Sequence, residues 1–397
     1  MAKAALLGIG TVGSGVAELL CSNAAQIASG AGEEIELKYI LCARPHPESP
    51  FADKIVFDFS AIENDPEVAV VAECIGGAGA AYDYVRRALL AGKSVVTSNK
   101  ELIAEKGVEL LSLAAEKNAR LLFEASVAGG IPIIRPLSQC LAANRVEEIY
   151  GILNGTTNYI LTQMFQCGQS FDTALKEAQR LGYAESDPSA DVDGLDAGRK
   201  ICILADICFG RSVPPESIKI RGIGGVAAAD AALAASLGFT LKLLGRARRV
   251  GERLAVYVSP HLIGQEKMLA NISGVMNGVV VRGNAVGECL FYGAGAGKLP
   301  TASAVVADII DAVRRSADGK DPVWSEGSLE DLTDSDELPS RWYVRAGADA
   351  DSLRRVFGGD AVSEGGESAV ITPEMPRAAL EEMCAGLEVR AIYPVLD

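Results

Sequence analysis

Histidine is nearly absent from this chain of 397 residues, which has only His46 and His261. Each stands beside a proline, and we expect both in turns. A serine or cysteine nucleophile served by histidine is therefore disfavoured, and a zinc site built on several histidines is excluded by count. The nine cysteines are scattered without a CxxC pair, so we expect reduced core residues. Acid–base chemistry must then come from lysine, carboxylate, tyrosine or water.

Positive charge is also scarce. Lysine and arginine number 37 against 52 acids, which gives a net charge of −15 and argues against a nucleic-acid partner. Charges interrupt every apolar stretch before it reaches membrane-spanning length, and the N-terminus has no signal-peptide pattern. We therefore expect a cytoplasmic protein without a membrane partner. The length predicts two or three domains.

A glycine motif follows the first expected strand, Lys3 to Leu7. It spans residues 8–13 and leads into a helical pattern from Ser14 to Leu20. A GxGxxG between a strand and a helix is typical of a dinucleotide site, because it lets the backbone approach a pyrophosphate at a helix N-terminus. The residues expected at the cofactor are Gly8, Gly10, Thr11, Val12 and Gly13. The alternative is a glycine-rich turn without a ligand.

The second expected strand, Glu36 to Cys42, bears on which cofactor is used. NAD-binding units usually place an acid at its end, but here Arg44 stands in that region and no acid does. An arginine there can meet a 2′-phosphate, so we expect NADP, with NAD possible. The alternative is a solvated loop arginine.

Further apolar strands alternate with helical patterns. They are expected at Val68 to Cys74, Ser94 to Thr97 and Arg120 to Glu124. This alternation predicts an α/β fold with a Rossmann-type doubly wound parallel sheet. Lys100 lies just beyond the carboxyl end of a strand, where such sheets bind ligands.

The loop from Glu124 to Pro132 is rich in small residues and has one carboxylate. A tightly curved loop that turns its backbone carbonyls inward can bind a hard cation together with one carboxylate. The alternative is a plain loop without a ligand. A second glycine loop, Tyr292 to Gly297, precedes a helix expected at Thr301 to Arg315. This loop could close over the cofactor. The strands expected between Leu241 and Phe291 indicate an antiparallel sheet.

The stretch from Tyr183 to Lys200 carries five acids ahead of an apolar helical run. Asp196 and Lys200 are four residues apart, so they share one face of the expected helix. An acid and an amine held together could bind a small zwitterion and move a proton. The alternative is an ordinary capped helix with a surface ion pair.

Seven motifs stand in this order along the chain: Gly8–Gly13, Thr97–Lys100, Glu124–Pro132, Gly151–Asn158, Gly182–Pro188, Asp191–Lys200 and Gly293–Ser303. Together they resemble homoserine dehydrogenase over roughly residues 1 to 316. The resemblance implies reversible NAD(P)-linked reduction of L-aspartate 4-semialdehyde to L-homoserine, in threonine, methionine and isoleucine biosynthesis. It also implies a homodimer or higher homo-oligomer.

The resemblance assigns roles to individual residues. Lys200 is implied as the proton donor, and Lys100 lies near the same substrate oxygen and the cofactor. Glu185, Asp196 and Asp191 are implied at the substrate. Gly182 and Gly297 are implied at the cofactor, as further members of its site. Sodium is implied at Glu124 and at the carbonyls of Val127, Gly129 and Ile131.

The sequence pattern and the resemblance together suggest how the chain is divided. We expect a nucleotide-binding domain (1–132 and 294–316), an α+β substrate and dimerisation domain (133–293), a linker (317–340) and a small ACT-like βαββαβ domain (341–397). We expect no kinase domain in front. Gly347 to Asp351 stands where ACT modules have a ligand turn, which speaks against feedback inhibition by threonine. Two alternatives stay open: a nucleotide-binding sensor without catalysis, and an oxidoreductase acting on another small amino or hydroxy acid.

Overall fold

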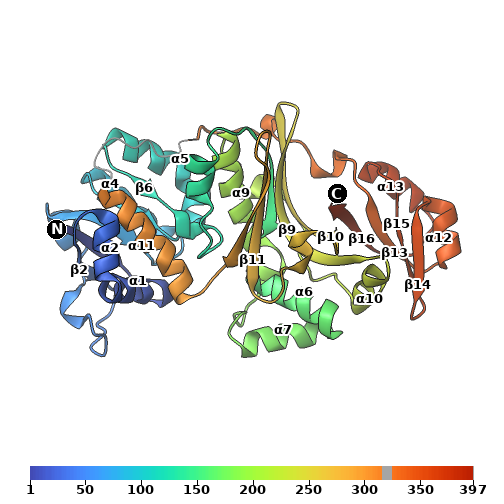
Figure 1. Cartoon of the computed structure of the whole chain (residues 1–397), viewed down its shortest axis with the longest axis horizontal. Coiled ribbons are helices and arrows are strands. Elements are labelled where there is room, and N and C mark those ends of the chain that lie inside the picture. The colour runs from blue at the N-terminus through green and yellow to red at the C-terminus, as the bar shows by residue number, and fades with distance from the viewer. Residues whose placement is uncertain (315–323, 397) are drawn as a thin grey trace. The chain divides into compact units, whose positions relative to one another are not determined.

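The computed structural model describes residues 1–314 and 324–396. The chain forms two compact units (Figure 1). The first comprises residues 1–144, 202–215 and 293–327, and the second comprises residues 145–201, 216–292 and 328–397. Among the described residues, every helix is too short or too polar to cross a membrane.

The first unit is built on a six-stranded parallel sheet. Its strands are β1 (Ala2–Leu7), β2 (Ile35–Leu41), β3 (Ile55–Val56), β4 (Val68–Glu73), β5 (Ser94–Thr97) and β6 (Leu121–Leu122). They lie in the order β3-β2-β1-β4-β5-β6, and every neighbouring pair is parallel. This is the doubly wound order of dinucleotide-binding folds, so the prediction from the sequence is confirmed.

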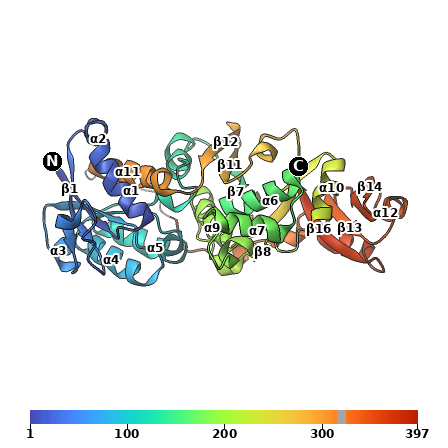
Figure 2. The same cartoon turned by 90° about the horizontal axis from the view of Figure 1, so that it is seen from below.

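Helices cover both faces of this sheet. They are α1 (Thr11–Ser22), α2 (Ala24–Ala31), α3 (Ser60–Glu63), α4 (Gly79–Leu90), α5 (Lys100–Glu116) and α11 (Lys298–Arg314). Figure 2 shows α1, α2 and α11 on one side of the sheet and α3, α4 and α5 on the other. The helix expected at Thr301 begins three residues earlier, at Lys298. Pro300 thus lies in the first turn, where its missing N–H removes no helical hydrogen bond. Arg315, the expected last residue, lies outside the described residues.

The second unit contains a mixed sheet with an antiparallel part, as predicted. Its strands here are β7 (Val146–Ile152), β8 (Lys219–Ile220), β9 (Phe239–Val250), β10 (Arg253–Gly264), β11 (Met276–Gly283) and β12 (Gly287–Ala294). Antiparallel pairing joins β11 to β7, β7 to β9 and β9 to β10. The helices are α6 (Gly155–Cys167), α7 (Phe171–Arg180), α8 (Ser189–Val192) and α10 (Ala228–Ser236). A further helix, α9 (Leu195–Phe209), runs from the second unit into the first.

The expectation that His261 lies in a turn is wrong. Pro260 and His261 are inside β10, and His261 is completely buried. Beyond β9, β10 pairs with β8 at Tyr257 and Val258 and with β16 at Leu262 and Ile263. Pro260 falls between these two paired segments, so its missing N–H disturbs neither the β8 nor the β16 ladder. Burial and the charge of Arg246 lower the pKa of His261 to about 3, so this imidazole is neutral.

The C-terminal segment of the second unit has the βαββαβ order that the sequence predicts. Its elements are β13 (Trp342–Ala346), α12 (Ala350–Phe357), β14 (Asp360–Glu364), β15 (Glu367–Ile371), α13 (Arg377–Met383) and β16 (Val389–Leu396). Strand β16 pairs with β10, so this segment continues the sheet of the same unit. Buried Asp230 on α10 accepts hydrogen bonds from Arg345 (2.7 Å) and Tyr343 (3.0 Å). Its likeness to an ACT domain stays a prediction.

Part of the predicted linker, residues 317–323, lies outside the described residues. Further on, Trp324 is buried and packs edge-on against Phe123 within the first unit. In the second unit, Lys219 pairs with Asp334 and Asp336, and Leu338 is buried. Residues 324–340 are therefore held to the protein at Trp324, Asp334, Asp336 and Leu338, while most of the other residues in this segment are exposed or partly exposed. The division into four segments stays a prediction.

Candidate active site

A polar cluster in the second unit forms where β7 ends and α6 begins. Asn154 is the N-cap of α6, and its Oδ1 accepts the Thr157 N–H at 2.9 Å. This bond turns the amide nitrogen towards two acids. Nδ2 donates to Asp191 Oδ1 at 2.6 Å and to Asp196 Oδ2 at 2.9 Å. One buried amide thus joins the acidic loop to the helix that follows it.

Lys200 completes this cluster. Its Nζ donates to Asp196 Oδ2 at 2.6 Å, one helical turn earlier on α9, and to the Leu153 carbonyl at 2.8 Å. The side chains of Lys200 and Asp196 are only 12% and 9% exposed. The alternative of a surface ion pair is therefore wrong. An ammonium group has three N–H donors, and no other described residue accepts the third from Lys200.

The acids of the cluster differ in environment. Burial raises the pKa of Asp191, opposed by the hydrogen bond from Asn154 and aided by the charge of Asp196. The predicted substrate residue Glu185 is exposed on the same loop. Among the described residues, none forms a hydrogen bond with its carboxylate. The structure therefore brings together Asp191, Asp196 and Lys200, and it leaves Glu185 open to solvent.

The glycine motif has the geometry of a dinucleotide site. Gly8 has a φ of +90°, and a Cβ on Gly13 would lie 2.1 Å from the Gly8 carbonyl oxygen. Both positions therefore require glycine. Gly10 precedes α1 without a side-chain cap, and a Cβ there would meet nothing within 4 Å. The first N–H groups of α1, beginning with Thr11 and Val12, can accordingly receive an anion.

The other predicted cofactor residues lie outside the glycine motif. Arg44 is exposed in the bend after β2, beside a cavity of about 910 Å³ lined by residues such as Ile9, Pro45 and Lys298. Lys100 is the first residue of α5, which Asn99 caps by accepting the Leu102 N–H. Gly182 ends α7 in a Schellman motif, since it and Tyr183 donate to the carbonyls of Gln179 and Ala178. Helix termination is thus a structural reason for this glycine.

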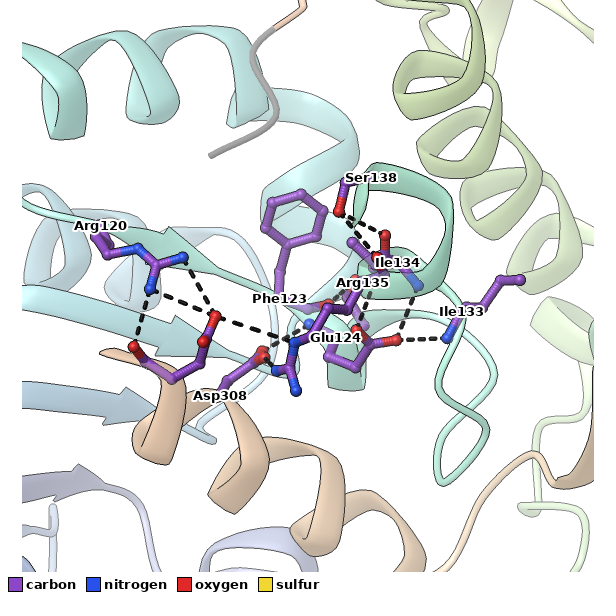
Figure 3. Close-up of polar contacts among 10 residues, drawn as sticks. Arg120, Phe123, Glu124, Ile133, Ile134, Arg135, Ser138 and Asp308 are labelled. Carbon is purple, nitrogen blue, oxygen red and sulfur yellow. Dashed lines mark hydrogen bonds and ion pairs between the residues drawn. The ribbon is translucent and has the colours of Figure 1, made fainter. Parts of the chain in front are cut away.

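Glu124 is buried at the start of the loop predicted to bind a cation (Figure 3). Its Oε1 accepts the N–H groups of Ile133 (2.6 Å) and Ile134 (2.8 Å), and Oε2 accepts that of Arg135 (2.8 Å). The Glu124 N–H donates to buried Asp308, which also pairs with Arg135. Burial and the charge of Glu124 raise the pKa of Asp308 to about 7. The carboxylate of Glu124 therefore holds the loop closed at its base.

The predicted cation loop packs against the second glycine loop within the first unit. Gly130 donates its N–H to the Ala294 carbonyl at 3.0 Å. A Cβ on Gly129 would lie 2.5 Å from the Gly295 oxygen. Gly297, which was predicted at the cofactor, has a φ of +122° just before α11. Across the described residues, no group of three or more His, Cys, Asp and Glu side chains gathers as a metal site.

Comparison with known proteins decides the family. A sequence model described as homoserine dehydrogenase matches residues 132–310, and its NAD-binding domain matches residues 8–124. The homoserine dehydrogenase of Pseudomonas aeruginosa is 46% identical over 313 residues, covering 79% of this chain and 72% of the relative. That of Neisseria gonorrhoeae is 43% identical, covering 86% of this chain and 81% of the relative. The chain belongs to the homoserine dehydrogenase family.

Solved structures of the family agree with this fold. A homoserine dehydrogenase from Thiobacillus denitrificans has a TM-score of 0.89 at 36% identity, covering 100% of this chain and 98% of the other. A hyperthermophilic archaeal homoserine dehydrogenase in complex with NADPH has a TM-score of 0.67 at 30% identity, covering 78% of this chain and 97% of the other. Membership of this enzyme family favours the dehydrogenase over both alternatives, the sensor and another oxidoreductase.

Two features of the site are missing from the sequence-based assignment. The bridging role of Asn154 was not assigned, although its place as a helix cap was recognisable from the sequence. The buried carboxylate of Glu124 was predicted only as a cation ligand, whereas in the structure it accepts three backbone N–H groups. Neither contact could be read from spacing, because Asn154 lies 37 residues from Asp191 and Glu124 lies 11 from Arg135.

Proposed function

We propose that this chain catalyses the reversible NADP-linked reduction of L-aspartate 4-semialdehyde to L-homoserine. The observation that carries the proposal is the Lys200 ammonium group, held by Asp196 and the Leu153 carbonyl with one N–H left for a ligand. Family membership indicates which substrate is used. The cluster contains a proton donor of the kind that reduction of an aldehyde needs.

The chain's own residues have two tasks in this reaction. When bound, a nicotinamide cofactor supplies the hydride to the aldehyde carbon. Lys200 Nζ then gives its proton to the oxygen that becomes the hydroxyl, and it takes the proton back in the reverse direction. Asp196 and the Leu153 carbonyl hold the Lys200 ammonium group in one orientation by accepting two of its N–H groups. In the proposal Lys100 stabilises the same oxygen electrostatically.

The substrate carries an α-ammonium group, and carboxylates are its natural partners. We assign Glu185, Asp191 and Asp196 to its binding. The exposed Glu185 has its carboxylate available, whereas Asp191 and Asp196 are already oriented by Asn154. Asn154 is therefore a positioning residue in the proposal.

We assign the cofactor to the glycine motif, with its pyrophosphate at the N-terminus of α1. Open space at Gly10 and the obligatory glycines at positions 8 and 13 support this assignment. Arg44 is proposed to bind the 2′-phosphate, which gives a preference for NADP over NAD. The NADPH complex of the archaeal relative is consistent with that preference. Lys100, Gly182 and Gly297 are assigned to the nicotinamide half.

A sodium ion is proposed at the loop that follows Glu124. Among the described residues, none donates a hydrogen bond to the carbonyl of Val127, Gly129 or Ile131. These three oxygens and the Glu124 carboxylate form an oxygen-only donor set, which suits a hard cation. Such an ion would stabilise the conformation of the loop and would take no part in proton or hydride transfer.

The remaining assignments follow from the family resemblance. We propose a homodimer or larger homo-oligomer built through the substrate domain, and a cytoplasmic enzyme of threonine, methionine and isoleucine biosynthesis. We also propose that residues 341–397 form an ACT-like module that serves structure or assembly.

The experiment that tests the proposed reaction is a steady-state assay of the purified chain with L-homoserine. Formation of NADPH or NADH is followed in parallel reactions, and small hydroxy acids such as L-serine and L-lactate are the control substrates. We expect reduction of NADP with L-homoserine and much slower reduction of NAD. Equal rates with a control hydroxy acid, or no rate with L-homoserine, would contradict the proposal.

A further inference from the structure

A buried carboxylate lies at the crevice of the nucleotide-binding sheet. Glu73 is the last residue of β4, and it pairs with Leu7, the last residue of β1. The strand order reverses between these two strands, and open α/β sheets bind their ligands at that point. Glu73 is 0% exposed. A buried acid is costly unless it is fully hydrogen-bonded, so its partners indicate why it is there.

Each partner of the Glu73 carboxylate lies at or just after the carboxyl end of a strand that borders the crevice. Oε1 accepts the N–H groups of Ile75 at 2.6 Å and Gly76 at 3.2 Å. Oε2 accepts the Thr97 hydroxyl at 2.5 Å. The first two donors follow β4, and the third ends β5. One side chain therefore connects the turn after β4 to the end of the adjacent strand β5.

The connection continues to the helix that begins with Lys100. Thr97 Oγ1 accepts the Asn99 N–H at 3.0 Å, and Asn99 Nδ2 donates to the Gly77 carbonyl at 2.7 Å. Asn99 Oδ1 also caps α5 by accepting the Leu102 N–H at 3.1 Å. These bonds close a ring through Glu73, Thr97, Asn99 and the turn at Gly76 and Gly77.

The turn itself is suited to a ligand. Gly76 and Gly77 have φ values of +83° and +71°, and a Cβ on either would meet nothing within 4 Å. The left-handed backbone explains the two glycines, and open space beside them leaves room for another molecule. The Glu73 carboxylate fixes this conformation by holding two consecutive N–H groups.

We propose that Glu73 is a positioning residue that locks the turn after β4 and the start of α5 into one rigid edge of the cofactor site. The inference rests on the proposed function, because it assigns to this edge the cofactor and Lys100. Glu73 contacts neither the substrate nor the reacting atoms in this scheme. It acts through Gly76 and through Thr97 and Asn99.

The chemistry explains why a carboxylate is required rather than an amide. Both carboxylate oxygens accept, whereas a glutamine would present an NH₂ group to the Thr97 hydroxyl. That hydroxyl already accepts the Asn99 N–H. With glutamine at position 73, the Thr97 hydroxyl oxygen would accept two hydrogen bonds. Its own proton would lose the carboxylate oxygen that accepts it in wild type. Glu73→Gln thus keeps the shape of the side chain and disrupts the ring at one bond.

The test compares Glu73→Gln and Thr97→Val with wild type. The readouts are the Kd for NADPH by nicotinamide fluorescence, the kcat and KM with L-homoserine, and the melting temperature. We expect both variants to raise the Kd for NADPH and to lower kcat by about tenfold each, the size of one lost buried hydrogen bond. The KM for L-homoserine should stay within about twofold of wild type, because the substrate acids lie elsewhere in the chain.

Asp230→Asn is the matched control. It removes another buried acid, which holds Arg345 and Tyr343 in the second unit. This variant should lose stability while keeping the wild-type Kd for NADPH. Thr97→Val interrupts the same ring without changing any charge, so it decides the matter if Glu73→Gln does not fold.

Three outcomes would overturn the inference. They are an unchanged Kd and kcat in the folded variants, an equal loss of NADPH affinity in Asp230→Asn, and a wild-type protein that binds no NADPH. Wild type that binds NADPH but does not oxidise L-homoserine would contradict the proposed reaction instead. The comparison of NADPH affinities would then still decide the role of Glu73.

Discussion

Replacing Asn154 with serine separates the two roles of its side chain, which are capping α6 and orienting Asp191 and Asp196. Serine is as good an N-cap as asparagine, so it can still accept the Thr157 N–H that begins α6. It is too short to donate to both Asp191 and Asp196, which the asparagine amide reaches at 2.6 and 2.9 Å. Asn154→Ser should therefore leave the helix intact and release the two acids.

The size of the effect follows from these contacts. A hydrogen bond to a charged group contributes about 1.5–3 kcal/mol. Asp191 is half-buried, so water can replace one of the two bonds, and we take the net loss as about 2.5 kcal/mol. This loss corresponds to about 70-fold in kcat/KM for L-homoserine. The free energy of unfolding should fall as well, by up to about 2.5 kcal/mol, because the same bonds are lost from the folded state, although the cap itself is kept.

The assay compares initial rates of NADP reduction and urea unfolding in wild type, Asn154→Ser and Ser170→Ala. Ser170 caps α7 by accepting the Thr173 N–H and contacts none of the acids in the cluster. Its variant should lose about 1 kcal/mol of stability with unchanged kcat/KM, whereas Asn154→Ser should lose both stability and kcat/KM. The reasoning is refuted if folded Asn154→Ser keeps kcat/KM within about twofold of wild type.

Three further substitutions test other parts of the account. Arg44→Asp should lower the ratio of kcat/KM for NADP to that for NAD by at least about tenfold, and an unchanged ratio in steady-state assays would remove Arg44 from the cofactor site. Burial lowers the pKa of Lys242 from 10.5 to about 8, so the unfolded chain binds more protons between those values. Stability should therefore rise with pH across that window, by about 3 kcal/mol in all, and urea unfolding at pH 8 and 10 should show that Lys242→Met lacks the rise. Asp230→Asn leaves the Arg345 charge buried and should cost about 3 kcal/mol in urea unfolding, whereas Asp351→Asn at an exposed pair should cost little. Equal losses of the free energy of unfolding in Asp230→Asn and Asp351→Asn would contradict the claim that burial makes the Asp230 pair more important.

Much of the fold was readable from local pattern. The parallel sheet follows from apolar strands that alternate with helices, and the glycine motif marked its first turn. His261 shows where such reasoning fails. A proline beside a histidine is typical of a turn, but β10 tolerates Pro260 because β8 and β16 pair with β10 on either side of that position and leave it unpaired on that edge. Which neighbours a strand has is a tertiary property that no local pattern carries.

The site was predictable to a similar degree. Spacing placed Asp196 and Lys200 on one helix face, and the structure shows them paired. Spacing could not reveal that Asn154 bridges Asp191 and Asp196, since this contact joins segments that are distant in the chain. Charge alone also misses Glu73, because a single acid at a strand end gives no sign of the backbone N–H groups that surround it.

The most direct test of the central claim is a comparison of wild type with Lys200→Ala, using L-homoserine and NADP. Lys176→Ala, which changes an exposed lysine on α7, is the control. The account predicts that Lys200→Ala lowers kcat by at least about 100-fold while the Kd for NADPH stays within about twofold. Ordinary turnover by Lys200→Ala, beside an unaffected control, would contradict the assignment of Lys200 as the proton donor.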